Sequence, residues 1–410
     1  MRDREKIILA GRSDPDSPVE MRQHPYDFAS FPNRVSMMSD ICLRHDKYDG
    51  GAYSGKATFR MRLISPVHVG SGIYELSEDV GFPSNKVVRG ITRKDGEPIV
   101  PGSSIKGAVR SNYESITKSC VRIHKSFSRE KYDKKQRHRS KLPNAVISGL
   151  NRSSGKIQVE LRGVLKASQR GRSYACPELK SRNGIPPETI SLCPACALFG
   201  GMGYKGRITF GDATIITSEQ KPQPVGVVAL NTPHLHRAGF KIDVRQAGGR
   251  EKIEVSQPYG RKFYYQSDID GGDPNTNDLI DYIPADSVLE FVLNFNDVLE
   301  AEIGGILVSL GINQNFPFRI GGGKPIGLGM VKVELVRVEQ SAQPAERFRA
   351  FNSHPSEVDC VAWIAEKREI FERWTSYNYL SGLEQIEMIT AKKRPTQEEA
   401  DNAGYPEKTG

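Results

Sequence analysis

The chain alternates polar and apolar side chains along Lys56-Ala57-Thr58-Phe59-Arg60-Met61-Arg62-Leu63-Ile64. A period of two is typical of a β-strand that buries one face and leaves the other in water. Further strands are predicted at Ile157–Val164, Arg207–Ile216, Ser287–Asn296 and Met330–Val338. Helices are predicted at Ser104–Lys118, which begins with capping serines, and at Val298–Leu310, which is apolar at helical spacing. Strands alternating with a few helices and long polar insertions indicate an α+β domain built on one antiparallel sheet.

The composition limits the class of protein. The chain has 410 residues, enough for one large or two ordinary domains. Its 58 Lys and Arg residues exceed its 49 Asp and Glu residues, and the net charge of +9 is compatible with a polyanionic partner. No apolar run approaches the ~20 residues of a membrane-spanning helix, and the apolar stretch after Lys6 is too short for a signal peptide. With only six cysteines, these features predict a cytoplasmic protein that makes no membrane contact.

The two ends of the chain differ from its middle. Residues 1–55 are polar and carry little periodicity, which predicts an extended N-terminal arm. Residues 345–410 are expected to hold one amphipathic helix, Glu357–Leu380, followed by a polar tail. Trp363 and Trp374 lie on the apolar side of this helix. We expect these two residues to anchor neighbouring subunits, unless the helix simply caps its own domain.

Positive charge is concentrated between Thr117 and Lys141. This stretch holds ten Lys or Arg residues and only two acids, Glu130 and Asp133, and its core has no apolar period. It fits either a solvated loop or a basic arm that binds phosphate groups in a salt-sensitive way.

The stretch Val100-Pro101-Gly102-Ser103-Ser104-Ile105-Lys106-Gly107-Ala108-Val109-Arg110 combines a turn, capping serines and a helix start. Lys106 and Arg110 are four residues apart, so they share one face near the exposed amides of the first turn. Such a face can bind phosphate. The alternative is an ordinary capped helix with two solvated bases.

The stretch Phe318-Arg319-Ile320-Gly321-Gly322-Gly323-Lys324-Pro325-Ile326-Gly327-Leu328-Gly329-Met330-Val331 has five glycines in nine positions before a predicted strand. Glycines let a backbone approach a ligand closely and offer its amides as donors. It is not a P-loop, because Lys324 is followed by Pro325 rather than by Ser or Thr on a helix. A glycine-rich hairpin or bulge is the alternative.

The pair Cys193-Pro194-Ala195-Cys196 has the spacing of a metal chelate, and Cys176 supplies a third thiol upstream. Tetrahedral zinc needs four ligands. The candidates for the remaining ligand are Cys120, His124 and His138. A redox pair is the rival interpretation, but the flanking residues do not form the strand-to-helix pattern of that class. The sequence therefore favours a structural zinc ion with an open fourth ligand.

The order of these motifs resembles the RAMP (repeat-associated mysterious protein) superfamily, the backbone subunits of type III and related class 1 CRISPR effector complexes. The resemblance covers about residues 25–340. It is carried by Val100–Arg110, Cys193–Gly200, Gly206–Ala213 and Gly321–Gly329, with further matches at Pro66–Gly72, Gly260–Tyr265 and Pro25–Phe28.

The resemblance implies a modified ferredoxin-like (RRM-like) palm over residues 56–340, with a zinc-containing insertion at about 118–200 and a thumb hairpin at about 231–282. It implies a subunit that binds a guide crRNA, pairs it with target RNA, and has other effector subunits or further copies of this chain as neighbours. The residues expected to bind RNA are Ser103, Ser104, Lys106, Arg110, His234, His236, Arg237, Lys241, Arg245, Arg261, Lys262, Gly322, Gly323 and Lys324. Phe263, Tyr264 and Tyr265 are candidates for stacking on bases, although strand packing competes for them.

Catalysis is the weaker part of the resemblance. Target-cleaving relatives carry an acid just before a segment that resembles Val87-Val88-Arg89, and here Ser84, Asn85 and Lys86 stand there. Asp79 is the nearest candidate, and would use Mg²⁺ or Mn²⁺ as an endoribonuclease, or else is a solvated loop acid. A second alternative is processing of guide precursors by a histidine base, for which the candidates are His68, His234 and His236. A non-catalytic scaffold is the favoured expectation.

Overall fold

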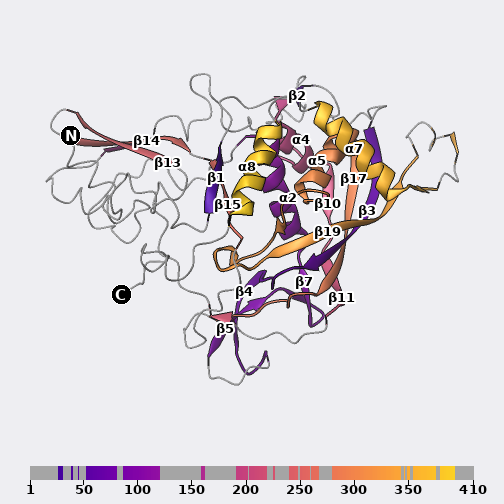
Figure 1. Ribbon diagram of the computed structural model, residues 1–410, viewed down its shortest axis with the longest axis horizontal. Helices are drawn as coiled ribbons and strands as arrows, with labels where there is room; N and C mark the ends of the chain where they lie inside the picture. Colours follow the sequence, from indigo (N-terminus) through magenta and orange to yellow (C-terminus); the bar gives the residue numbers. More distant parts are fainter. Residues whose placement is uncertain are drawn as a thin grey trace.

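The architecture is described from a computed structural model of the chain (Figure 1). The described residues are 26–30, 38–39, 45, 52–80, 86–120, 158–161, 191–201, 203–218, 225–226, 240–247, 250–258, 260–266, 279–342, 346, 349–350, 354–374 and 379–392.

A large, mainly antiparallel sheet forms the centre of the fold. Its middle strand, β3 (Ala52–Leu63), pairs antiparallel with β17 (Val288–Leu299) on one side and with β19 (Met330–Gln340) on the other. The sheet runs in the order β18-β19-β3-β17-β11-β7-β6, and Figure 1 shows it curving beneath the helices. The shorter strands are β6 (Arg93–Lys94), β7 (Glu97–Val100), β10 (Ile208–Phe210), β11 (Ala213–Thr217), β18 (Phe318–Arg319) and β20 (Ser356–Glu357).

The alternation in β3 decides which face of the sheet is buried. Ala57, Phe59, Met61 and Leu63 are buried, whereas the intervening arginines point to the open face. Phe59 stacks on Phe291 of β17 with ring centroids 5.2 Å apart. Packing of this kind drives sheet formation, since each buried large apolar side chain contributes roughly 1.5–3 kcal/mol.

Helices cover the buried face. They are α2 (Gly102–Ile116), α4 (Pro194–Phe199), α5 (Glu300–Ser309), α7 (Cys360–Trp374) and α8 (Tyr379–Ala391). Figure 1 shows them gathered on one side of the sheet. Two glycines of α5 let α7 approach closely: a Cβ on Gly304 would lie 2.0 Å from the carbonyl oxygen of Lys367, and one on Gly305 would lie 2.9 Å from Phe371.

The main elements follow one another as β3, α2, β10 and β11, β17, α5 and β19. This is a strand–helix–strand–strand–helix–strand order, with the strands lying side by side as β19-β3-β17-β11. The prediction of an α+β fold on an antiparallel sheet is therefore confirmed.

The strand predicted at Arg207–Ile216 is interrupted, so this boundary is wrong. Gly211 and Asp212 separate β10 from β11, although both strands pair with β17 and the amide of Gly211 donates to the carbonyl oxygen of Val292 at 2.8 Å. At this break, Oδ1 of Asp212 accepts a hydrogen bond of 2.8 Å from the amide of Gly102 at the start of α2.

The single C-terminal helix predicted at Glu357–Leu380 is also wrong, because the structure has two helices, α7 and α8. Both pack within this chain. Trp363, expected to anchor a neighbouring subunit, is only 5% exposed, while Trp374 is 37% exposed. In α8, Ile386 and Ile389 are buried in a cluster with Ile116 of α2.

Smaller sheets lie outside the main one. Strands β13 (Phe240–Ala247) and β14 (Arg250–Pro258) form an antiparallel hairpin, and β8 (Gln158–Leu161) joins β14 in parallel. The region expected to be the thumb thus pairs with a strand from the expected insertion. The remaining pairings are β1 (Tyr26–Ser30) with β15 (Gly260–Tyr264), β2 (Met38–Ser39) with β9 (Ser191–Leu192), and the sheet β12-β16-β5-β4, made of Val225–Gly226, Leu279–Ile280, Val87–Ile91 and Gly70–Leu76.

Within the part of the chain that the structure describes, no helix has the length and apolar character needed to cross a membrane.

Candidate nucleic-acid interface and metal centre

The start of α2 is tightly packed on the sheet. A Cβ on Gly102 would lie 2.1 Å from the carbonyl oxygen of Phe210, so glycine is required there. Ser103 is exposed and Ser104 half-buried in the first turn. The two serines of the first turn are therefore at least partly exposed to solvent, while the amide of Gly102 donates its hydrogen bond to Asp212.

Lys106 lies half-buried between α2 and β10. Its Nζ donates a hydrogen bond of 3.3 Å to the carbonyl oxygen of Ile208. Burial lowers the pKa of the Lys106 ammonium, and the positive charge of Arg110 lowers it further. None of the residues that the structure describes supplies a carboxylate partner for Lys106.

The guanidinium of Arg110 contacts three neighbouring residues of this chain. Its Nε donates to Oε1 of Glu114 at 2.7 Å and its Nη1 to the carbonyl oxygen of Gly200 at 3.0 Å. Its Nη2 lies 3.6 Å from the sulfur of Cys196. Burial lowers the pKa of Arg110, but the hydrogen bond and charge of Glu114 outweigh burial and leave the pKa raised.

Arg261 of β15 joins the same network. Its Nη2 lies 2.7 Å from Oε2 of Glu114 and donates a hydrogen bond of 3.0 Å to the carbonyl oxygen of Cys120. Glu114 therefore bridges Arg110 and Arg261. Both arginines were expected to bind RNA, and here they connect α2, β15 and the cysteines.

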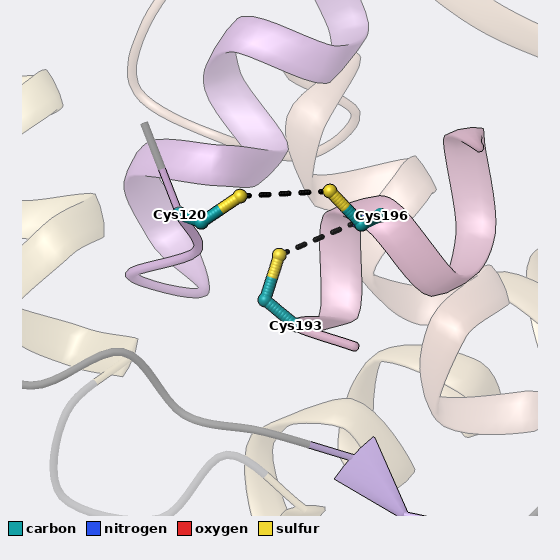
Figure 2. A group of neighbouring side chains, drawn as sticks. All are labelled: Cys120, Cys193 and Cys196. Atoms are coloured by element: carbon teal, nitrogen blue, oxygen red, sulfur yellow. Dashed lines mark hydrogen bonds between the residues drawn. The ribbon is translucent and has the colours of Figure 1, made fainter. Parts of the chain in front are cut away.

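Three cysteines converge where α2 ends and α4 begins (Figure 2). Cys120, Cys193 and Cys196 are all buried, and their sulfur atoms lie within 4.8 Å of one another. The sulfurs of Cys120 and Cys196 are 3.5 Å apart, which is far longer than a disulfide bond of about 2.05 Å. Cys193 caps α4, and its sulfur accepts the amide of Cys196.

This geometry fits a tetrahedral thiolate metal site. Sulfurs bound to one zinc ion at about 2.3 Å lie about 3.8 Å apart, close to the spacing observed. Within the described part of the chain, the cluster offers three ligands. Cys176 and the alternative ligands His124 and His138 lie outside the described residues.

The glycine-rich stretch is docked on the segment that follows β3. The amide of Gly322 donates to the carbonyl oxygen of His68 at 2.8 Å, and that of Gly329 donates to Pro66 at 2.9 Å. Gly321 has a φ of 80°, and a Cβ there would lie 2.3 Å from the His68 carbonyl oxygen. Close packing thus explains why residue 321 is a glycine. Gly322 is exposed and Gly323 is partly exposed.

Two cations, Arg319 and Lys324, lie on either side of the three consecutive glycines of this stretch. Lys324 opens a short 3-10 helix, and burial followed by the charge of Arg319 lowers its pKa. Arg319 donates from Nη2 to the carbonyl oxygen of Tyr265 at 2.7 Å. Its Nε and Nη1 are buried without a hydrogen-bond partner, and burial lowers the pKa of Arg319 to about 10.

His68 lies beside the same stretch. Its Nδ1 is 2.6 Å from the carbonyl oxygen of Asp281, so Nδ1 carries the proton and donates it. The carboxylate of Asp281 is paired with Arg93 at 2.8 Å. Burial lowers the pKa of His68, which keeps its ring neutral.

The structure describes only some of the residues expected to form the thumb surface. Lys241 and Arg245 belong to β13, and Lys262 of β15 places its Nζ 4.2 Å from the ring centroid of Tyr26. Phe263 and Tyr265 are buried, so they are unavailable for stacking on bases. The remaining thumb candidates, which lie outside the described residues, are His234, His236 and Arg237.

Asp79 is exposed in the turn after β4, where its amide donates to the carbonyl oxygen of Leu76 at 3.0 Å. Across the described ranges, the cysteine cluster is the only group of three or more potential metal ligands. Asp79 is therefore not brought into a metal-binding group by the residues described.

The structure is thus an α+β domain on an antiparallel sheet, with a three-thiol cluster and two cations beside a glycine-rich turn. The sequence model of the RAMP superfamily matches residues 60–332. The chain therefore belongs to the RAMP superfamily. A search of curated proteins found no match. Membership implies an RNA-binding subunit associated with CRISPR effector complexes.

Proposed function

We propose that this chain is a guide-RNA-binding backbone subunit of a CRISPR ribonucleoprotein effector that pairs its guide crRNA with target RNA. The palm would be ferredoxin-like, which the order of β3, α2, β11, β17, α5 and β19 supports. The accompanying regions would be the arm at 1–55, the insertion at 118–200, the thumb at 231–282 and the C-terminal segment at 345–410. Its neighbours would be other effector subunits or further copies of this chain, in the cytoplasm.

One observation carries the proposal. Lys106 and Lys324 come from the two motifs that point to phosphate binding, and both are partly buried with lowered pKa values because of burial. Neither has a carboxylate partner among the residues described. A desolvated ammonium without a counter-ion is unfavourable unless a ligand supplies negative charge. RNA phosphates would supply it, with Ser103, Ser104, Gly322 and Gly323 offering additional donors.

A structural zinc ion would accompany this role. Cys120, Cys193, Cys196 and Cys176 would bind it, with His124 as the alternative to one thiol. Zinc bound by thiolates would supply structural cross-linking of the end of α2 to α4. Arg110 and Arg261 would then act by holding the cysteine-bearing segments rather than by direct contact with RNA.

The test compares lysines that differ in their partners. Lys106→Met and Lys324→Met are each expected to weaken binding of a single-stranded guide RNA by about tenfold or more. The control is Lys332→Met, because Lys332 is exposed and its Nζ lies 3.2 Å from Glu334. Affinities measured at two salt concentrations would show the wild-type chain losing affinity as salt rises. Equal binding by all four proteins would contradict the proposal.

A further inference from the structure

The guanidinium of Arg319 is the strongest unexplained feature of the described residues. One nitrogen, Nη2, donates to Tyr265, while Nε and Nη1 have neither exposed surface nor a hydrogen-bond partner. Arginine carries its charge permanently. Burying charged N–H donors without acceptors costs free energy, and it is uncommon in folded proteins.

Lys324 adds to the free-energy cost of burying the Arg319 guanidinium. The charge of Arg319 lowers the pKa of Lys324, so the two cations lie close enough to repel one another. No acidic side chain of the described ranges pairs with either cation. Two like charges that are both removed from water and left without a counter-ion destabilise the free chain. This arrangement therefore needs a ligand to be favourable.

Of the four residues between these cations, Gly322 leaves room for a ligand. Gly321, Gly322 and Gly323 carry no side chains, and Gly322 is exposed. Near Gly322, an added Cβ would meet only His68, at 3.3 Å from its ring. A bulky anion can therefore approach the backbone from this side. For contact with Arg319, the side chain would have to turn so that Nε and Nη1, which are buried here, face the anion.

We propose that Arg319 and Lys324 together bind a single phosphate group of the bound RNA. This assignment rests on the proposed function and adds Arg319, which forms the phosphate contact with its two unpartnered nitrogens. A phosphodiester fits because it brings one negative charge and several acceptor oxygens between two cations. Bound phosphate would remove both the repulsion and the unsatisfied donors.

The first experiment measures RNA binding by the full chain. Arg319→Met, Arg319→Lys and Lys324→Met are each expected to weaken binding of single-stranded RNA by about tenfold or more. Arg319→Met should also reduce the slope of log affinity against log salt by about 0.7. The matched control is Arg373→Met, because Arg373 is exposed on α7 and paired with Glu369. Thermal unfolding checks folding, and Lys324→Met should not lower the midpoint because it removes an uncompensated charge.

The second experiment locates the phosphate. Uncharged methylphosphonate replaces one phosphodiester of the RNA at a time. At one linkage this replacement should weaken binding to the wild-type chain about tenfold yet leave binding to the Arg319→Met/Lys324→Met double variant unchanged, because the double variant has already lost both contacts to that phosphate. If every linkage affects both proteins equally while the wild type binds RNA, the phosphate site is wrong and the proposed function stands. If the wild type binds no RNA, both are wrong.

Discussion

Arg207 shows how a single residue joins the parts of this domain. Its Nη2 pairs with Glu302 of α5, its Nη1 donates to the carbonyl oxygen of Asp297 at 2.7 Å, and its Nε donates to Ala197 of α4 at 3.1 Å. The Arg207 and Glu302 side chains are 2% and 0% exposed. The pair therefore fixes the CxxC helix against the sheet and α5 from inside the core.

Replacing Arg207 with Met is expected to lower the free energy of unfolding by about 3–5 kcal/mol, because it leaves Glu302 buried without its partner. Chemical denaturation of the purified chain measures this change. The control is Arg60→Met, which removes an exposed ion pair with Glu290 at 3.4 Å and should cost less than about 1 kcal/mol. Equal losses for the two variants would contradict the structural role assigned to Arg207.

At the scale of elements, the cysteine cluster connects three segments that are distant in sequence. Cys120 follows α2, Cys193 and Cys196 belong to α4, and Arg261 reaches the cluster from β15 through the carbonyl oxygen of Cys120. Removing a metal from this cluster should therefore disturb β15 as well as α2 and α4.

We expect the purified wild-type chain to contain about one zinc ion, measured by native mass spectrometry. Cys196→Ser should lose the metal and unfold at a lower temperature, because thiolate zinc sites contribute on the order of 10 kcal/mol to folding. Cys360→Ser is the matched control, since Cys360 lies in α7 outside the cluster. A metal-free wild type that is as stable as the metal-treated protein would contradict this assignment.

The sequence predicts elements best where the pattern is local. The alternation in β3 and the capped start of α2 follow from side-chain periodicity and turn chemistry. The break at Asp212 depends on a distant amide, that of Gly102, which no local pattern reveals. Likewise, Leu383, Ile386 and Ile389 of α8 are buried in a cluster that includes Ile116 of α2, and the helix predicted at Glu357–Leu380 ends before these residues.

The candidate site shows the same limit. Spacing predicted Cys193 and Cys196 as candidate metal ligands, which the structure brings together with Cys120, and Lys106 and Lys324 as candidate phosphate ligands. Spacing did not reveal the neighbours of Arg110, whose guanidinium contacts Glu114, Gly200 and a cysteine sulfur. No local pattern distinguishes Arg319 within the glycine-rich motif, because burial of its nitrogens depends on the tertiary fold.

At the scale of the whole molecule, the sheet separates two kinds of surface. One face is covered by the helices, and the other carries charged side chains that pair across strands, such as Lys56 with Glu339 at 2.8 Å. Lys106, Arg319 and Lys324 lie elsewhere, on α2 and around the glycine-rich turn, and none of the three has a carboxylate partner among the residues described. In the proposed function, RNA would therefore follow these motifs rather than the charge-paired face.

Target cleavage is expected to be independent of Asp79. Asp79→Ala in the guide-loaded complex should leave the rate of target-RNA cleavage unchanged with Mg²⁺ or Mn²⁺, because Asp79 is an exposed turn residue outside any metal-binding group described. The neighbouring exposed acid provides the control variant, Glu78→Ala. A rate that falls about a hundredfold or more in Asp79→Ala alone, with guide binding intact, would make this chain an endoribonuclease subunit.

The central claim is that the chain binds guide RNA in its effector complex. The most direct measurement is to crosslink the chain to RNA in cells that carry its CRISPR locus, and to sequence the RNA recovered. We predict that crRNA guides dominate the recovered RNA, and that Lys106→Met combined with Lys324→Met removes most of it. Recovery of no RNA, or of cellular RNA without enrichment of guides, would contradict the account.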